Sequence, residues 1–125
     1  MQLTLKDDLP FMTIQVVYRG MEIEIPNVLV DTGSASTVLS ADLVAEIGLV
    51  PEPEDTLYTI RGVGGTEVVF TRQVDYLQID HQRLTQFQIE VGGMDYGFEI
   101  NGILGMDGLR QAGAIINLRD LRLEF

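Results

Sequence analysis

One short segment of the chain brings together residue types that could carry out acid–base chemistry. The apolar residues 28–30 are followed at once by Asp31, Thr32, Gly33 and Ser34. An apolar strand that ends on a carboxylate places that group where a buried strand reaches the surface. Its lost hydration must then be offset by hydrogen bonds or by a chemical role. Asp31 is therefore a candidate catalytic acid or base, and the alternative is an ordinary turn in which its side chain bonds its own backbone.

A glycine-rich segment is the second candidate for a functional element, and it joins two predicted strands at 56–60 and 67–70. Its residues are Arg61, Gly62, Val63, Gly64 and Gly65. Glycines tolerate positive φ and let a β-ribbon turn sharply, so the segment predicts a hairpin tip that can open and close. An ordinary hairpin and a phosphate-binding nest are the alternatives. No Gly-Lys-Ser/Thr sequence follows, which disfavours the nest.

Alternating apolar and polar residues predict a mostly β chain around these two segments. A hairpin is expected around Arg19 and Gly20. The strands at 74–79 and 87–91 are expected to pair with each other through a turn near Asp80. The other predicted strands lie at 11–17, 22–25, 28–30, 103–105, 114–118 and 121–125.

Two short helices interrupt the predicted strands. The first covers 41–47, with Ser40 as its cap and Gly48 at its end. The second lies around 109–111 and is stopped by Gly113.

A faint internal repeat relates two of the apolar strands. Residues 27–31 and 101–105 each form an apolar strand that ends at a polar or glycine turn, and each precedes a helix. Two such halves predict a pseudo-duplicated β structure in which Asp31 faces the turn at Gly105.

Composition limits the classes of function that remain. A chain of 125 residues fits one domain, and no apolar run approaches the roughly 18 residues of a membrane span. The net charge of −11 argues against nucleic acid as a partner, because phosphates need a basic face. There is no cysteine, which excludes disulfides and thiolate chemistry. The N-terminus lacks the pattern of a secretion signal, so a cytoplasmic location is expected.

The negative charge is unevenly placed along the chain. Residues 1–99 carry the whole excess, and residues 100–125 are balanced. The apolar residues of the neutral tail are Leu121, Leu123 and Phe125. They could pack against another subunit without strong repulsion, or form an edge strand on their own domain.

Five further polar residues are expected to be structural. Glu52, Glu54 and Asp55 flank prolines and predict a solvated loop. Asp107 is expected to be an acid at the start of a helix, stabilised by the helix dipole, rather than a catalytic group. His81 is expected to be a surface turn residue.

Three motifs together resemble those of the retropepsin-like aspartic proteases, the single-domain group that includes retroviral proteases. They are the apolar strand with its Asp-Thr-Gly-Ser turn, the glycine-rich tip, and the late apolar strand 103–105 with its glycine. The resemblance is closer to small bacterial aspartyl-protease-like domains, because residues 102–109 read GILGMDGL and two strands follow. It implies an all-β fold, a closed and mostly antiparallel barrel of the acid-protease type with two short helices, formed by residues 1–125 as one domain.

The resemblance also implies an aspartic endopeptidase that works as a homodimer on a peptide or protein substrate. Each subunit would supply one Asp31, and the pair would share a proton and activate a water molecule, without a metal or another cofactor. Thr32 would bond across the dimer, Gly33 would let the substrate backbone approach, and Ser34 would bond the outer carboxylate oxygen. Val63 would lie at the tip of a substrate-binding flap that includes its neighbours Arg61, Gly62, Gly64 and Gly65.

Two departures from the family pattern leave a rival open. Retroviral members pair an acidic residue with an arginine at the positions that Ala35 and Met106 occupy here. The helix at 41–47 also changes the wall of the cleft. The rival is a catalytically inactive domain that keeps the fold as a dimerisation or peptide-binding module. A monomeric β domain with an incidental Asp-Thr-Gly turn is the remaining alternative.

Overall fold

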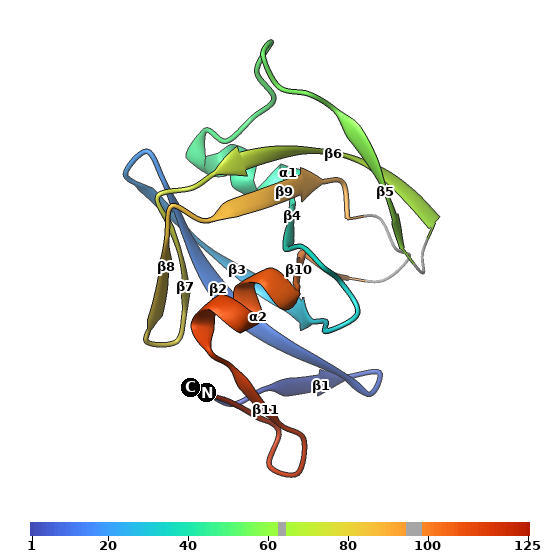
Figure 1. The fold of residues 1–125 in the computed structure, drawn as a ribbon, viewed down its shortest axis with the longest axis vertical. Coiled ribbons are helices and arrows are strands. Elements are labelled where there is room, and N and C mark those ends of the chain that lie inside the picture. Colours follow the sequence, from blue (N-terminus) through green and yellow to red (C-terminus); the bar gives the residue numbers. More distant parts are fainter. Residues whose placement is uncertain (63–64, 95–98) are drawn as a thin grey trace.

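The computed structural model of the protein describes residues 1–62, 65–94 and 99–125 (Figure 1). About half of the chain lies in strands. The strands are β1 (Thr4–Lys6), β2 (Leu9–Tyr18), β3 (Met21–Val30), β4 (Val38–Ser40), β5 (Tyr58–Gly62), β6 (Gly65–Gln73), β7 (Tyr76–Ile79), β8 (Gln82–Thr85), β9 (Gln88–Gly92), β10 (Gly102–Leu104), β11 (Ile115–Asn117) and β12 (Arg122–Glu124). The helical elements are α1 (Ala41–Val44), the 3-10 turn η1 (Ala45–Ile47) and α2 (Met106–Ala112). The predicted β class with two short helices is confirmed.

The strands form one large sheet and one small sheet. The order in the large sheet is β5-β6-β9-β4-β10-β3-β2-β7-β8, with β1 added to β2, and β11 pairs with β12. Most neighbours are antiparallel, but β10 runs parallel to β3 and β9 runs parallel to β4, so the sheet is mixed. Within the described ranges no pairing joins β5 to β8, so closure of the sheet into a barrel is not confirmed.

The predicted pairing of residues 74–79 with residues 87–91 is wrong. β7 turns near Asp80 as predicted, but it pairs with β8, and β9 lies between β6 and β4 instead. β8 has only four residues, of which Leu84 alone is buried, so alternation does not reveal it. Gln86 then adopts a φ of 51°, which ends β8 and redirects the chain to β9.

The hairpin of β2 and β3 forms as predicted but is longer. Arg19 and Gly20 make its turn, both with positive φ, as a tight two-residue connection requires. The strands predicted at 22–25 and 28–30 are one strand, β3. A register shift opposite residues 12–14 and the positive φ of Asn27 let this strand bend without breaking.

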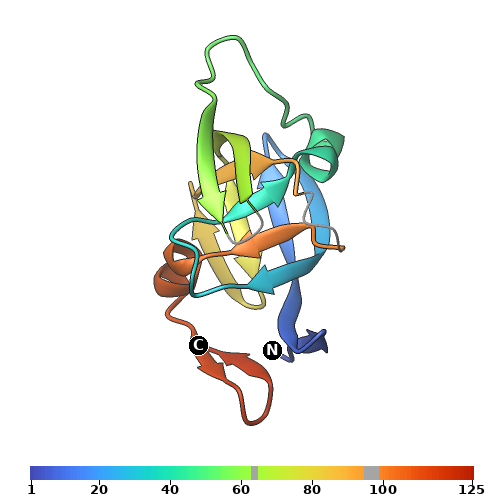
Figure 2. The same cartoon turned by 90° about the vertical axis from the view of Figure 1, so that its right-hand side faces the viewer.

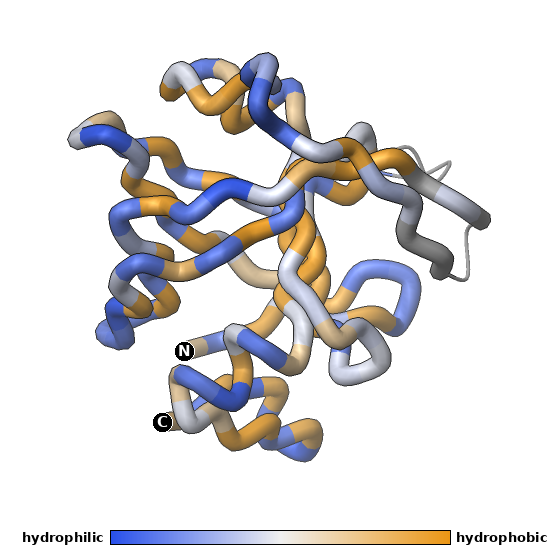
Figure 3. Tube along the Cα trace, turned by 45° about the horizontal axis from the view of Figure 1, so that its top comes forward, coloured by the Kyte–Doolittle hydropathy of each residue, from blue (hydrophilic) through white to orange (hydrophobic). Residues whose placement is uncertain are grey.

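The main core is formed by side chains of the large sheet, and buried residues of the two helices pack against them. Its centre is formed by Val16, Ile25, Leu39, Leu77 and Leu104, which are almost completely buried. In Figure 3 the hydrophobic colours accordingly follow the central strands, and the hydrophilic colours gather at hairpin ends and surface turns. Both helices end at glycines in the left-handed region, Gly48 and Gly113, as predicted. Ser40 stands at the N-cap of α1, but its side chain makes no capping bond.

The two ends of the chain lie together (Figure 1). Met1 and Leu123 exchange backbone hydrogen bonds at 2.9 and 2.8 Å, and Leu3 N donates to the carbonyl of Leu121 at 2.7 Å. Leu123 is completely buried, and Phe125 keeps 41% of its surface exposed. The C-terminal strand therefore packs on its own chain through Leu123.

The acidic loop after η1 is not simply solvated, contrary to the prediction. Arg72 bonds both Glu52, at 3.0 Å, and Asp55, and the side chains of Arg72 and Asp55 are only 12% and 13% exposed. Burial alone lowers the pKa of Arg72, but its bonds to Tyr18 and Asp55 outweigh that effect and raise the pKa above its usual value. The buried arginine thus ties the loop to the sheet, while Glu54 remains exposed.

No helix among the described residues is long and apolar enough to cross a membrane.

Candidate active site

Asp31 follows directly on the last residue of β3, where a buried strand reaches the surface. Val28 and Val30 are buried, and Asp31 is half-buried. The backbone N–H of Asp31 donates to the carbonyl of Leu104 at 3.0 Å, which extends the pairing of β3 with β10 by one residue. The two strands lie side by side in Figure 2, so the two repeats noticed in the sequence do face each other.

The turn after Asp31 is closed by bonds to Asp31 itself. Gly33 N donates to Asp31 Oδ1 at 2.8 Å, and Ser34 N donates to the carbonyl of Asp31 at 3.2 Å. A Cβ on Gly33 would meet Asp31 Oδ1 at 3.1 Å, so a larger residue there would crowd the carboxylate. No described residue donates to Asp31 Oδ2, which leaves this oxygen available to a ligand.

The side chains of Thr32 and Ser34 take different places in the turn. Thr32 is exposed. Ser34 Oγ donates to the carbonyl of Ser36 at 2.7 Å, rather than to the outer oxygen of Asp31 as expected from the resemblance. Within this chain Ser34 therefore shapes the turn, and Thr32 is free to meet a group outside it.

Gly105 lets the turn pass close to the start of α2. Met106 N donates to the carbonyl of Ser34 at 2.8 Å. A Cβ on Gly105 would lie 2.3 Å from the carbonyl oxygen of Ser36 and 2.9 Å from that of Ser34, both backbone atoms. Only glycine fits this contact, which explains the apolar-apolar-Gly motif of the sequence.

Thr37 and Asp107 connect the turn to α2. Thr37 is completely buried, and its hydroxyl donates to Asp107 Oδ1 at 2.8 Å while accepting from Gly105 N at 3.2 Å. Asp107 also accepts from Thr37 N at 3.2 Å and from Gly108 N at 2.7 Å. Asp107 is thus the acid at a helix start that the sequence predicted, and it additionally anchors the turn that carries Asp31.

Sequence reasoning missed Thr37 and its role. The signal available was weak, because Thr37 lies in a run of small polar residues that reads as a loop. The two positions at which retroviral members carry a charged pair, Ala35 and Met106, are uncharged here. Thr37 and Asp107 instead form the side-chain connection between turn and helix.

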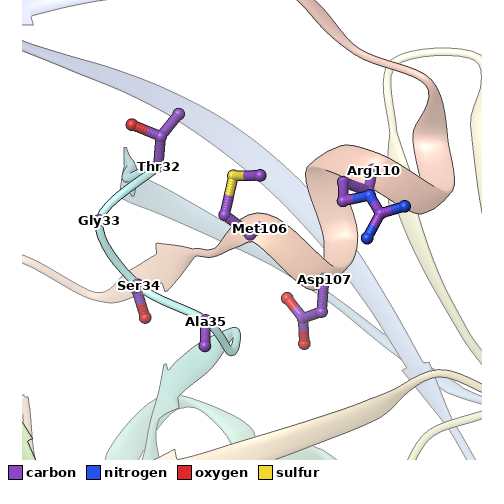
Figure 4. Close-up of a pocket in the computed structure, with 7 residues that line it drawn as sticks. All are labelled: Thr32, Gly33, Ser34, Ala35, Met106, Asp107 and Arg110. Atoms are coloured by element: carbon purple, nitrogen blue, oxygen red, sulfur yellow. The ribbon is translucent and has the colours of Figure 1, made fainter.

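A hollow of about 550 Å³ lies beside the turn, on its α2 side (Figure 4). It is lined by Thr32, Gly33, Ser34, Ala35, Met106, Asp107 and Arg110. Asp31 is not among the lining residues, so the hollow lies next to the carboxylate's turn rather than at the carboxylate. Its walls come from the Asp-Thr-Gly-Ser turn and from the helix that follows the late glycine motif, which the fold brings together.

The glycine-rich hairpin forms where the sequence predicted it. β5 and β6 pair up to Gly62 and Gly65, and Arg61 pairs with Thr66. In Figure 1 this hairpin and the turn after β3 lie on the same side of the molecule, with the hairpin above. Val63 and Gly64, which the sequence assigns to the tip, lie outside the described residues.

The described part of the chain contains no group of three acidic or imidazole side chains arranged to hold a metal ion. His81, in the turn after β7, has a side chain that is 92% exposed, in keeping with its predicted surface position.

Comparison with known families agrees with the motifs. A family model described as aspartyl protease, from the retropepsin-like clan, matches residues 14–107, which include the Asp31 turn, the glycine hairpin and the late glycine motif. The chain therefore belongs to the aspartyl protease family. A comparison with curated protein sequences gave no match.

Proposed function

We propose that the protein is an aspartic endopeptidase whose active site forms between two copies of the chain, with Asp31 from each. The observation that carries the proposal is the setting of Asp31. Its Oδ1 is held by Gly33 N at 2.8 Å, and its Oδ2 has no donor among the described residues. A carboxylate fixed on one side and open on the other is suited to bind and activate a water molecule.

The proposed mechanism needs two carboxyl groups that share one proton, because two adjacent carboxylates do not both ionise readily. The ionised Asp31 takes a proton from the water, and the resulting oxygen attacks the peptide carbonyl carbon. Asp31 of the partner subunit, which is protonated, donates its proton to the carbonyl oxygen. When the tetrahedral intermediate collapses, the C–N bond breaks and the amine nitrogen receives a proton from the dyad.

The surroundings of Asp31 support roles for the neighbouring residues. Thr32 is exposed and could bond its counterpart across the dimer, which would fix the two turns against each other. Gly33 leaves room for the substrate backbone beside the carboxylate. We further propose that the β5–β6 hairpin, with Arg61, Val63 and the flanking glycines, closes over the substrate and excludes water. In this proposal residues 1–125 form one closed domain.

The test is cleavage of a diverse peptide library by the wild type and by Asp31→Asn, with Asp42→Asn as a matched control. Asp42 is an exposed acid in α1. The proposal expects cleavage by the wild type and by Asp42→Asn, and its loss by at least about 10³-fold in Asp31→Asn. Equal cleavage by all three proteins would assign the activity to a contaminant or to another residue.

The uncharged pair Ala35 and Met106 favours one second candidate, an inactive member that binds peptides or dimerises. This candidate expects no cleavage at any pH from a protein that sedimentation shows to be dimeric. It also expects peptide binding that Asp31→Asn leaves unchanged.

A further inference from the structure

One row of paired residues crosses the large sheet beside the candidate active site. The row is Thr71, Glu90, Val38, Ile103, Leu29 and Phe11, one residue from each of six adjacent strands. Directly paired residues point their side chains to the same face of a sheet. Asp31 lies two residues beyond Leu29, one period of a strand, and its backbone still bonds β10. The row and Asp31 therefore belong to the same face.

This face is an apolar surface that is only partly covered. Phe11 and Val38 are buried, whereas Leu29, Ile103 and Tyr58 pack against them and remain partly exposed. An extended peptide bound at Asp31 would cover the exposed parts of these side chains. That use of the face rests on the proposed function.

Glu90 is the one charged residue of the row, and it is incompletely bonded. Its Oε2 is the only buried side-chain polar atom without a hydrogen-bond partner in the described part of the chain. The Tyr58 hydroxyl interacts with the same carboxyl group, and burial followed by the charge of Glu90 raises the pKa of Tyr58. A buried carboxylate oxygen without a partner is costly, so its presence calls for an explanation.

Two other half-buried acids of this protein, Asp107 and Asp55, have partners for their carboxylate groups. Asp107 accepts three hydrogen bonds, from two atoms of Thr37 and from Gly108. Asp55 is paired with Arg72. Acids with a structural role in this chain are therefore satisfied, and Glu90 stands apart from them on the face that carries Asp31.

We propose that Glu90 is a specificity-determining residue that binds a lysine or arginine side chain of the peptide substrate. Because Oε2 is buried in the free chain while Glu90 as a whole is half-buried, the carboxyl group would turn towards the face as the peptide binds. A cationic side chain would then supply the donor that Oε2 lacks, and its aliphatic part would lie on the apolar residues of the row. The net charge of −11 would also draw basic peptides towards the protein.

The register places this subsite near the scissile bond. Adjacent strands lie about 4.8 Å apart, so three strand steps separate the backbone of Glu90 from that of Leu29 by about 14 Å. An extended peptide advances about 3.4 Å per residue, so the basic side chain should lie within about four residues of the cleaved bond.

The experiment measures kcat/KM on peptides that carry lysine, arginine, norleucine or glutamate in turn at each of four positions on either side of the cleaved bond. Norleucine matches the aliphatic part of the lysine side chain and lacks its ammonium group. The wild type should prefer lysine or arginine over norleucine by about tenfold or more at one position, a difference in keeping with one buried charged contact. In Glu90→Gln the ratio should fall to within about twofold of one.

Two further variants make the result specific. Glu46→Gln, an exposed acid in η1, should keep the wild-type ratio. Glu90→Lys should shift the preference at the same position towards glutamate. Thermal melting of each variant confirms that it is folded. Cleavage without a basic preference, or a preference that survives Glu90→Gln, would overturn the assignment and leave the proposed peptidase intact.

If the wild type cleaves nothing, the proposed function fails and the subsite is tested by binding. Fluorescence anisotropy would then compare the lysine and norleucine peptides on the wild type and on Glu90→Gln. Tighter binding of the lysine peptide that disappears in Glu90→Gln supports the subsite. Equal binding of the two peptides, or binding of neither, overturns it.

Discussion

Replacing Thr37 with valine removes one hydroxyl from the centre of the turn that carries Asp31, and leaves the shape of the side chain almost unchanged. Thr37 is completely buried, so solvent cannot replace the lost bonds. Two bonds disappear, the one that its hydroxyl donates to Asp107 at 2.8 Å and the one that it accepts from Gly105 N at 3.2 Å. The bond to a carboxylate contributes about 1.5–3 kcal/mol, and the unpaired N–H costs about 1–3 kcal/mol. Allowing for partial relaxation, we expect Thr37→Val to lower the free energy of unfolding by about 3 kcal/mol.

The assay is urea denaturation followed by circular dichroism, at one fixed protein concentration because association would shift the transition. Thr37→Ser keeps the hydroxyl and loses one methyl group, which should cost only about 1 kcal/mol. Thr13→Val, at an exposed position of β2, should change the stability by less than about 0.5 kcal/mol. If Thr37→Val were as stable as Thr37→Ser, the two hydrogen bonds would not hold the turn, and our reading of this connection would be refuted.

Two other substitutions, each with a control variant, test further contacts of the fold. Gly105→Ala should lower the free energy of unfolding by about 2–3 kcal/mol and abolish cleavage, because the new Cβ would lie 2.3 Å from a backbone oxygen. Its control is Gly20→Ala, in a remote hairpin where the φ of 80° strains any residue other than glycine. Gly20→Ala should lower the free energy of unfolding by about 1 kcal/mol and leave cleavage intact. Retained activity in Gly105→Ala would show that the turn can move without loss of function. Arg72→Met should destabilise the protein by about 1–3 kcal/mol in thermal melts, since it leaves Asp55 half-buried and unpaired. The control is Arg19→Met, at a side chain that is 67% exposed, which should lower the free energy of unfolding by less than about 0.5 kcal/mol. An equal effect of the two substitutions would contradict the role given to Arg72.

The sequence predicted the elements that have strong local signals. The hairpin at Arg19 and Gly20, the glycine-terminated helices and the β5–β6 ribbon all depend on residues that restrict the backbone directly. The internal repeat predicted that the turn at Asp31 lies opposite the turn at Gly105. These features need only neighbouring residues or a repeated pattern, and both are visible in one chain.

The errors concern contacts between residues far apart in the chain. The strand β8 is too short for alternation to reveal it, so β9 was expected beside β7. The acids after η1 read as solvated, because nothing local indicates that Arg72, seventeen residues beyond Asp55, packs against them. Thr37 looked like an ordinary loop residue for the same reason. Its importance comes from Asp107, which only the fold brings into contact with it.

The proposed active site requires Asp31 from two chains, and mixing of wild-type and mutant subunits tests this requirement. Wild type and Asp31→Asn would be unfolded together, refolded in equal amounts, and assayed on a peptide that the wild type cleaves. Random pairing leaves about one quarter of the dimers with two Asp31 residues, so the activity per total protein should fall to about one quarter of the wild-type value. A fall to only one half, linear in the fraction of wild-type chains, would show that each chain acts alone and would rule out an active site shared by two chains.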